Sequence, residues 1–271
     1  MRTLREFRNP PSAAGRLRDA ARSAIIGGLS LVPRHSPSAW VRFPYYHYVF
    51  DDERRAFAAQ LAYLRNRGEF ISIDRAVALL RGTEPVDGRY FCITFDDGFR
   101  NCLTNAVPIL LEHGAVAAFF VTTDFVGASP LKDPEQIRRV SNGGPRVPDF
   151  LSWQECREMI LAGMTIGSHT VSHRRLSTLS DAEAEVELRE SKVIIERELG
   201  TQCHHFSCPK GGPERDFRTG RDPVIARRLG YASFLTTQRG SVHRLSDPFL
   251  VERDHLLAAW GTHQLRYFFS R

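Results

Sequence analysis

At 271 residues, with 42% of them hydrophobic, the chain has ample material for the core of one large domain or two small ones. Its net charge of +6 is concentrated in residues 1–40, which hold seven arginines against two acidic residues. The rest of the chain is close to neutral, which argues against nucleic acid as a partner. Five cysteines without a C-x-x-C pair indicate free thiols and a cytoplasmic protein rather than a disulfide framework.

Residues 1–40 are expected to form a basic leader, followed by the main domain at 41–271. The apolar run Ala24–Val32 is too short to span a bilayer. Residues 14–32 are a candidate membrane-surface helix, with apolar side chains on one face and arginines turned away, which would make the protein membrane-peripheral. Two alternatives stay open: a leader that packs against the domain, and a signal for export to the periplasm, although no clear cleavage site follows.

In chain order, apolar and β-branched runs predict strands at 41–50, 70–73, 91–95, 116–121, 164–166, 205–208, 231–235 and 249–252. Helical periodicity and start signals predict helices at 51–68, 74–80, 103–111, 152–163, 180–200 and 223–229. Residues 127–150 have no period, which is typical of a long functional loop. Strands and helices therefore alternate throughout, and the sequence predicts a single α/β, barrel-like domain.

The strand at 91–95 ends in two adjacent carboxylates, Asp96 and Asp97, followed by Gly98. In parallel α/β folds, functional sites form at the carboxyl edge of the sheet, where this strand would deliver both acids. The alternative is an ordinary turn in which Asp97 caps the next helix. A second cluster favours the functional interpretation, because His169 and His173 follow the predicted strand at 164–166.

Two histidines four residues apart can reach one ion from a turn or a first helical turn. Two imidazoles and one carboxylate are a standard ligand set for catalytic zinc, with one position left open. The second carboxylate is then available to accept a proton. We therefore expect one divalent transition metal, with Zn²⁺ favoured, held by His169, His173 and one of the two aspartates.

Thr94–Gly98 and His169–His173 resemble the first two motifs of the polysaccharide deacetylase family, carbohydrate esterase family 4, with its nodulation-type chitooligosaccharide deacetylase domain. The resemblance extends from about Tyr45 to about Arg253. It implies a distorted, incomplete (β/α) barrel with a metal at the carboxyl ends of its strands. It also implies hydrolysis of an N-acyl group, usually acetyl, from an N-acetylated glycan such as one containing N-acetylglucosamine.

Carried over by position, the resemblance makes Asp96 the general base and Asp97, His169 and His173 the metal ligands. The third family motif, aromatic-Pro-aromatic-Gly, corresponds to Cys208–Gly211 and departs at both aromatic positions. Its implied role is to direct the backbone N–H of Lys210, after Pro209, at the oxyanion. The side chain of Lys210 is left with two interpretations, contact with an anionic substrate or simple solvation.

The family's late Leu-His-Asp motif, which supplies a general acid, is not evident. Tyr46-His47 resembles the early strand that supplies the acid in circularly permuted members acting on poly-N-acetylglucosamine. This makes His47 the expected acid, with Asp51 or Asp52 as orienting carboxylates, although a core histidine is the alternative. His255, in Arg253–His255, is the competing candidate for the acid.

The function predicted from the sequence is a metal-dependent hydrolase that de-N-acetylates an amino sugar in a polysaccharide, an oligosaccharide or a lipid-linked glycan. The altered third motif supports a different class, a non-catalytic protein that binds a glycan or lipid surface and keeps the metal site. A phosphoester hydrolase is a third class, but such enzymes often use two metals and the sequence offers ligands for one.

Overall fold

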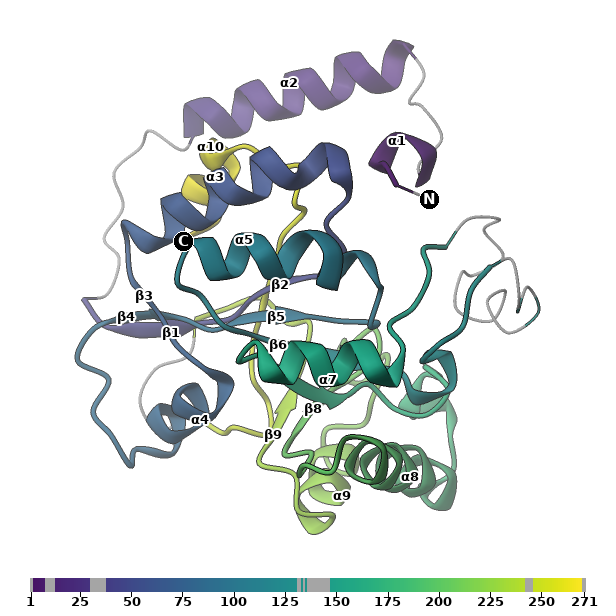
Figure 1. Cartoon of the computed structure of the whole chain (residues 1–271). Coiled ribbons are helices and arrows are strands. Elements are labelled where there is room, and N and C mark those ends of the chain that lie inside the picture. The colour runs from purple at the N-terminus through teal and green to yellow at the C-terminus, as the bar shows by residue number, and fades with distance from the viewer. Residues whose placement is uncertain are drawn as a thin grey trace.

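The computed structural model describes residues 2–7, 13–29, 38–130, 133, 135, 147–241 and 246–269. Its main element is a seven-stranded sheet of order β10-β2-β5-β6-β7-β8-β9, and a smaller sheet has the order β1-β4-β3 (Figure 1). Their bounds are β1 Trp40–Arg42, β2 Pro44–Tyr46, β3 Glu69–Phe70, β4 Arg89–Phe91, β5 Ile93–Phe95, β6 Ala117–Val121, β7 Thr165–Ser168, β8 His205–Ser207, β9 Ser233–Leu235 and β10 Asp254–His255.

Every pairing between these strands is parallel, so their carboxyl ends lie along one edge. The sheet curls into an incomplete barrel, which confirms the predicted fold class. Strands β5 and β6 are buried along their whole length, as expected of central parallel strands covered on both faces. Phe95 stacks on Phe119 of the next strand, with 4.7 Å between ring centroids, and anchors the core below the carboxyl edge.

Two long strands expected from the sequence are each divided between the two sheets. The run at 41–50 forms β1 and then β2, with the change of sheet at Phe43, and the run at 91–95 belongs to β4 and β5, with the change at Cys92. Pro44 is the first residue of β2, a position where proline's missing N–H does not break the ladder. The strand β2 lies between β10 and β5, inside the sheet.

Helices pack on both sides of the sheet (Figure 1). Their bounds are α1 Leu4–Phe7, α2 Ala13–Leu29, α3 Arg54–Arg65, α4 Ile73–Arg81, α5 Val107–Glu112, α7 Trp153–Leu161, α8 Asp181–Leu199, α9 Asp222–Arg228 and α10 Thr262–Phe269. Ser152 and Ser180, where two of the expected helices begin, both form capping boxes. A π-helical turn, Cys102–Ala106, precedes α5.

The carboxyl-terminal region differs from the sequence-based expectation. The strand expected at 249–252 is reduced to an isolated bridge between Leu235 and Val251. The short strand β10 and the helix α10 were not predicted. Most of the loop expected at 127–150 lies outside the described residues, as does part of the leader.

Helix α2 packs against α10 (Figure 1), with Ile26 buried and Ser23 Oγ 2.8 Å from His263 Nε2. Leu17 and Ile25 are exposed on the same helix. Within the described part of the chain, no helix combines the length and the apolar character needed to cross a membrane. One face of α2 thus packs on the domain and another stays exposed, so packing of the leader does not exclude a role of α2 at a membrane surface.

Candidate active site

Three side chains predicted to hold a metal meet at the carboxyl edge of the sheet. Asp97 follows β5, and His169 and His173 follow β7, two strands along the sheet. The Nε2 atoms of His169 and His173 lie 3.4 and 3.3 Å from Asp97 Oδ1. One potential ligand atom from each residue falls within 4.8 Å of the other two, a grouping that could hold a metal ion. This donor set fits zinc or a similar divalent ion.

Unusual backbone conformations turn these side chains toward one another. Asp97, Thr170 and His173 have φ angles of 72°, 67° and 60°. The left-handed region costs a non-glycine residue about 1–2 kcal/mol, and such strain is concentrated at functional sites. Gly98 also has a positive φ, and a Cβ there would lie 3.0 Å from Val121 Cγ1. The turn after β5 therefore requires glycine next to the candidate ligand.

Neighbouring groups orient the two histidines. His169 Nδ1 lies 2.7 Å from the carbonyl oxygen of Ser207, so Nδ1 carries the proton and Nε2 is left to act as a ligand. Glu187 of α8 accepts hydrogen bonds from the backbone amides of Val171 and Ser172, both at 2.9 Å, and holds the loop that carries His173.

The charges of Asp96 and Asp97 raise the pKa of His169 against the effect of its burial. Burial alone would also raise the pKa of Asp97. The hydrogen bonds of both histidines to its carboxylate instead hold this pKa well below its ordinary value.

Asp96, the expected general base, forms a buried bidentate ion pair with Arg253. Arg253 Nη1 and Nη2 lie 2.9 and 2.7 Å from the two carboxylate oxygens, and Ser207 Oγ donates to Oδ1 at 3.0 Å. Burial alone would raise the pKa of Asp96, but the guanidinium and then His169 bring it below the ordinary value. Asp96 is therefore ionised and fixed in orientation, as a proton acceptor requires.

His47 and His255 lie together beside this ion pair. Their rings meet edge to face at 5.3 Å between centroids, and Tyr45 stacks on His255 at 4.8 Å. The guanidinium of Arg253 lies 4.2 Å from the Tyr45 ring centroid, which connects the cluster to Asp96. Burial, followed by the charge of His47, lowers the pKa of His255 to about 4. His255 is consequently neutral near pH 7, and His47 is left as the candidate proton donor.

The expected orienting carboxylates have other partners. Asp51 accepts hydrogen bonds from Arg2 Nε at 3.1 Å and Asn105 Nδ2 at 2.9 Å, and Asp52 accepts from the backbone amide of Leu4. The expectation that Asp51 or Asp52 orients His47 was therefore wrong. These two acids instead attach the amino-terminal segment to the connection after β2.

Pro209 and Lys210 follow β8 after one intervening residue, Cys208. Lys210 has a φ of 60°, and its carbonyl oxygen accepts a hydrogen bond from Thr237 Oγ1 at 2.7 Å. A Cβ at Gly211 would lie 2.7 Å from the backbone nitrogen of Thr237, so this turn also requires glycine. The turn is thus fixed through its backbone, whereas the role of the Lys210 N–H stays a prediction.

Sequence reasoning missed Arg253, Ser207 and Glu187 as supporting residues. Arg253 appeared only as the neighbour of His255, and Ser207 only as part of a strand. The one available signal was the buried strand context of Ser207, because a polar side chain there needs a partner. Arg253 reaches the site from a segment distant in sequence, and Glu187 from the helix that follows the His173 loop, and no local pattern marks either residue.

Comparison with known proteins supplies the family context. The family model described as polysaccharide deacetylase matches residues 83–232. A curated relative from Bacillus subtilis (strain 168), described as the putative polysaccharide deacetylase YxkH, is 23% identical over 202 residues. That match covers 74% of this chain but only 63% of the relative's length.

Two solved structures share the fold. IcaB from Ammonifex degensii has a TM-score of 0.72 and 23% identity, covering 88% of this chain and 100% of that one. The Streptococcus pyogenes deacetylase PplD, solved in complex with acetate, has a TM-score of 0.68 and 21% identity, covering 86% and 99%. Similarity at this level of identity shows a common architecture.

Proposed function

Because this chain belongs to the polysaccharide deacetylase family, we propose that it is a metal-dependent hydrolase that removes an N-acyl group, most simply acetyl, from an amino sugar of a glycan. The observation that carries the proposal is the meeting of Asp97, His169 and His173 beside an ionised Asp96. A site for one cation adjacent to one oriented base is what hydrolysis of an unactivated amide needs.

A divalent cation held by Asp97, His169 and His173 would polarise the acyl carbonyl and make water more acidic. Asp96 accepts the proton as the water oxygen forms its bond to the acyl carbon. The C–N bond then breaks, and His47 donates a proton to the departing nitrogen, since an amine anion is too poor a leaving group near neutral pH. The products are a carboxylate and a free amine. The Lys210 N–H is proposed to donate to the oxyanion.

The proposed partner is an N-acetylated glycan, and the proposed metal is Zn²⁺. The proposed location is cytoplasmic or at a membrane surface, with export as the alternative. Its support is that Cys92, Cys102, Cys156, Cys203 and Cys208 are all free and buried.

The second candidate function is non-catalytic binding of a glycan or lipid surface with retention of the metal. One observation favours it: Cys208 and Lys210 stand where the family's third motif has aromatic residues. The two candidates differ in turnover, because only the hydrolase releases acetate.

The test is to load the protein with zinc, offer polymeric, oligomeric and lipid-linked N-acetyl sugars, and measure released acetate. Asp96→Asn is expected to retain about one equivalent of metal and to lose at least about a hundredfold in rate. His169→Ala is expected to lose most of the metal. Bound metal without acetate release from any substrate would favour the binding protein instead, and metal retained by both His169→Ala and His173→Ala would refute the ligand assignment.

A further inference from the structure

His47, the proposed proton donor, lies just beyond β2, where regular backbone structure stops. The strand ends at Tyr46, and the next regular element is the short helical turn Asp51–Glu53. Residues 47–50 belong to no helix or strand, so no ladder of backbone hydrogen bonds fixes them. The position of His47 therefore depends on the groups that pack against this connection from either side.

One side of the connection is held by the π-helical turn that follows β5. Cys102 Sγ donates to the carbonyl oxygen of His47 at 3.4 Å. Asn105 Nδ2 donates to the carbonyl oxygen of Val49 and to Asp51 Oδ1, both at 2.9 Å. Turns of this kind are rare and are frequently found at functional sites. The π-helical turn thus supports the connection from the main domain.

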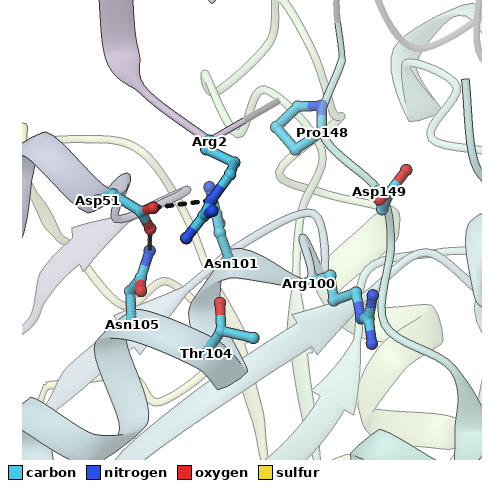
Figure 2. A pocket seen from close by; sticks show the side chains of 8 residues that line it. All are labelled: Arg2, Asp51, Arg100, Asn101, Thr104, Asn105, Pro148 and Asp149. Atoms are coloured by element: carbon cyan, nitrogen blue, oxygen red, sulfur yellow. Dashed lines mark hydrogen bonds and ion pairs between the residues drawn. The ribbon is translucent and has the colours of Figure 1, made fainter.

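The other side is held by the amino-terminal segment, residues 2–7, which contains α1. The backbone amide of Asp51 donates to the carbonyl oxygen of Arg2 at 3.0 Å. The backbone amide of Leu4 donates to Asp52 Oδ1 at 2.8 Å. Arg2 Nε also donates to Asp51 Oδ2 at 3.1 Å, where both side chains line a pocket of about 420 Å³ (Figure 2). The Arg2 side chain is 84% exposed, so this ion pair contributes little, and the bonds of the two backbone amides are the main polar attachment.

Phe7 adds an aromatic contact beside His47. Its ring meets the Tyr48 ring edge to face, with 5.1 Å between centroids, and lies 5.4 Å from the Phe50 ring. Tyr48 and Phe50 also contact each other, at 4.9 Å. Phe50 is fully buried and Phe7 is half-buried, so the three rings extend the core outward to the segment. Because Tyr48 follows His47 directly in the chain, displacement of these rings would also displace His47.

We propose that residues 2–7 are a positioning element for the reaction: they clamp the connection after β2 against the π-helical turn and hold His47 where it can protonate the departing nitrogen. The inference rests on the proposed function. The segment lies outside residues 83–232, the part of the chain that the family model matches. A displacement of about 1 Å can cost a reaction about a hundredfold in rate. A weakened clamp should therefore lower kcat and leave KM unchanged, because the acid acts only as the C–N bond breaks.

The experiment removes single contacts of the segment in the zinc-loaded full chain. Phe7→Ala and Asp52→Ala are each expected to lower kcat for acetate release about tenfold, at unchanged KM and zinc content. Phe7→Leu keeps an apolar side chain and Asp52→Asn keeps an acceptor oxygen, so both should recover most of the rate. Phe70→Ala is the control and should keep the kcat of the parent, because Phe70 is also half-buried and makes its ring contact with Phe91 in the smaller sheet.

Nuclear magnetic resonance separates this inference from the proposed hydrolysis. In protein isotope-labelled at histidine Cε1, the signal of His47 is the one missing from His47→Gln. This signal should shift and broaden in Phe7→Ala and Asp52→Ala but not in Phe70→Ala. A displaced signal in a parent protein that releases no acetate would refute the hydrolysis and support the clamp.

The clamp is overturned, and the hydrolase left standing, if Phe7→Ala and Asp52→Ala both keep the parent's His47 signal or both keep its kcat. A fall in kcat that comes with lost zinc or a raised KM also overturns it, because the segment would then act through the metal or the substrate instead of through His47.

Discussion

The two adjacent aspartates have different surroundings because the backbone turns between them. Asp96 continues the direction of β5 and meets Arg253 and Ser207, whereas Asp97, with its φ of 72°, turns toward the two histidines. The order of their proposed roles was predicted from the sequence through the family motif. The ion pair that keeps Asp96 charged was not, because Arg253 lies more than 150 residues away in the chain.

Replacing Arg253 should alter the pH dependence of the reaction. In Arg253→Met, burial of Asp96 is no longer opposed by the guanidinium, so the pKa of Asp96 should rise. The basic form is needed for turnover, and the acid limb of the kcat/KM profile should therefore move to higher pH. Arg253→Lys, which keeps the charge but loses the bidentate geometry, should shift it less.

The measurement is kcat/KM against pH at matched zinc content, with circular dichroism to confirm folding. An acid limb at the same pH in the parent and in Arg253→Met would mean that another group sets it. A folding defect in Arg253→Met leaves Arg253→Lys as the informative variant.

His47 and His255 provide a second test at the residue scale. His47→Gln should remove most of the rate and the alkaline limb of the profile, because the proton donor is lost. His255→Phe preserves the stacking on Tyr45 and should keep the alkaline limb, since His255, with its pKa of about 4, is neutral at the working pH. Rates are compared at equal metal occupancy. The reverse pattern would make His255 the acid and His47 a core residue.

At the scale of elements, the sequence predicted most strands and helices but not how the strands divide between sheets. The apolar runs at 41–50 and 91–95 look continuous, since burial on both faces hides any period. The breaks at Phe43 and Cys92 depend on the pairing of β1 and β4 in a separate sheet. Strand β10 has only two residues, so it carried no pattern that could be recognised.

The loop after β7 offers a test of how one element supports the site. Glu187 of α8 holds the amides of Val171 and Ser172 by its carboxylate. Glu187→Gln replaces an acceptor-only group by an amide and should loosen the loop that carries His173. Zinc affinity is expected to fall about 10- to 100-fold, the usual effect of losing support around a ligand.

The measurement is competition for zinc with a chelator of known affinity. Glu190→Gln is the control on the same helix, because Glu190 pairs only with Arg189 among the interactions described for it and its side chain is 44% exposed. Equal zinc affinity in the Glu187→Gln variant and the parent protein would show that the loop is held without Glu187.

At the scale of the whole molecule, the parallel order of the strands brings the residues of the site together. Parallel strands β2, β5, β7 and β8 all end at the same edge, which brings together side chains from His47 to Ser207. That much was predictable from alternating strands and helices. The charge distribution was equally readable from the sequence, and the structure adds that the basic leader helix α2 is docked on α10.

The last prediction concerns the exposed face of α2. Leu17 and Ile25 are 74% and 63% exposed, and Arg18 and Arg22 are exposed on the same helix. Apolar side chains among arginines are typical of a helix that binds an anionic membrane surface. The full chain should therefore bind vesicles that contain anionic lipid, and binding should weaken with added salt. A protein that starts at Ser36 should bind much less.

Leu17→Glu with Ile25→Glu tests the same face without removing the helix, since the docking side chain Ile26 is left in place. The matched control is Leu161→Glu with Val224→Glu, which changes leucine and valine side chains that are 89% and 59% exposed on α7 and α9. Sedimentation with vesicles at low and high salt gives the comparison. Both pairs of substitutions reduce surface hydrophobicity and net positive charge alike. If binding depends on α2, only the substitutions at Leu17 and Ile25 should therefore abolish it. Equal sedimentation of the parent, the shortened protein and both pairs would leave α2 as a packing element of the domain.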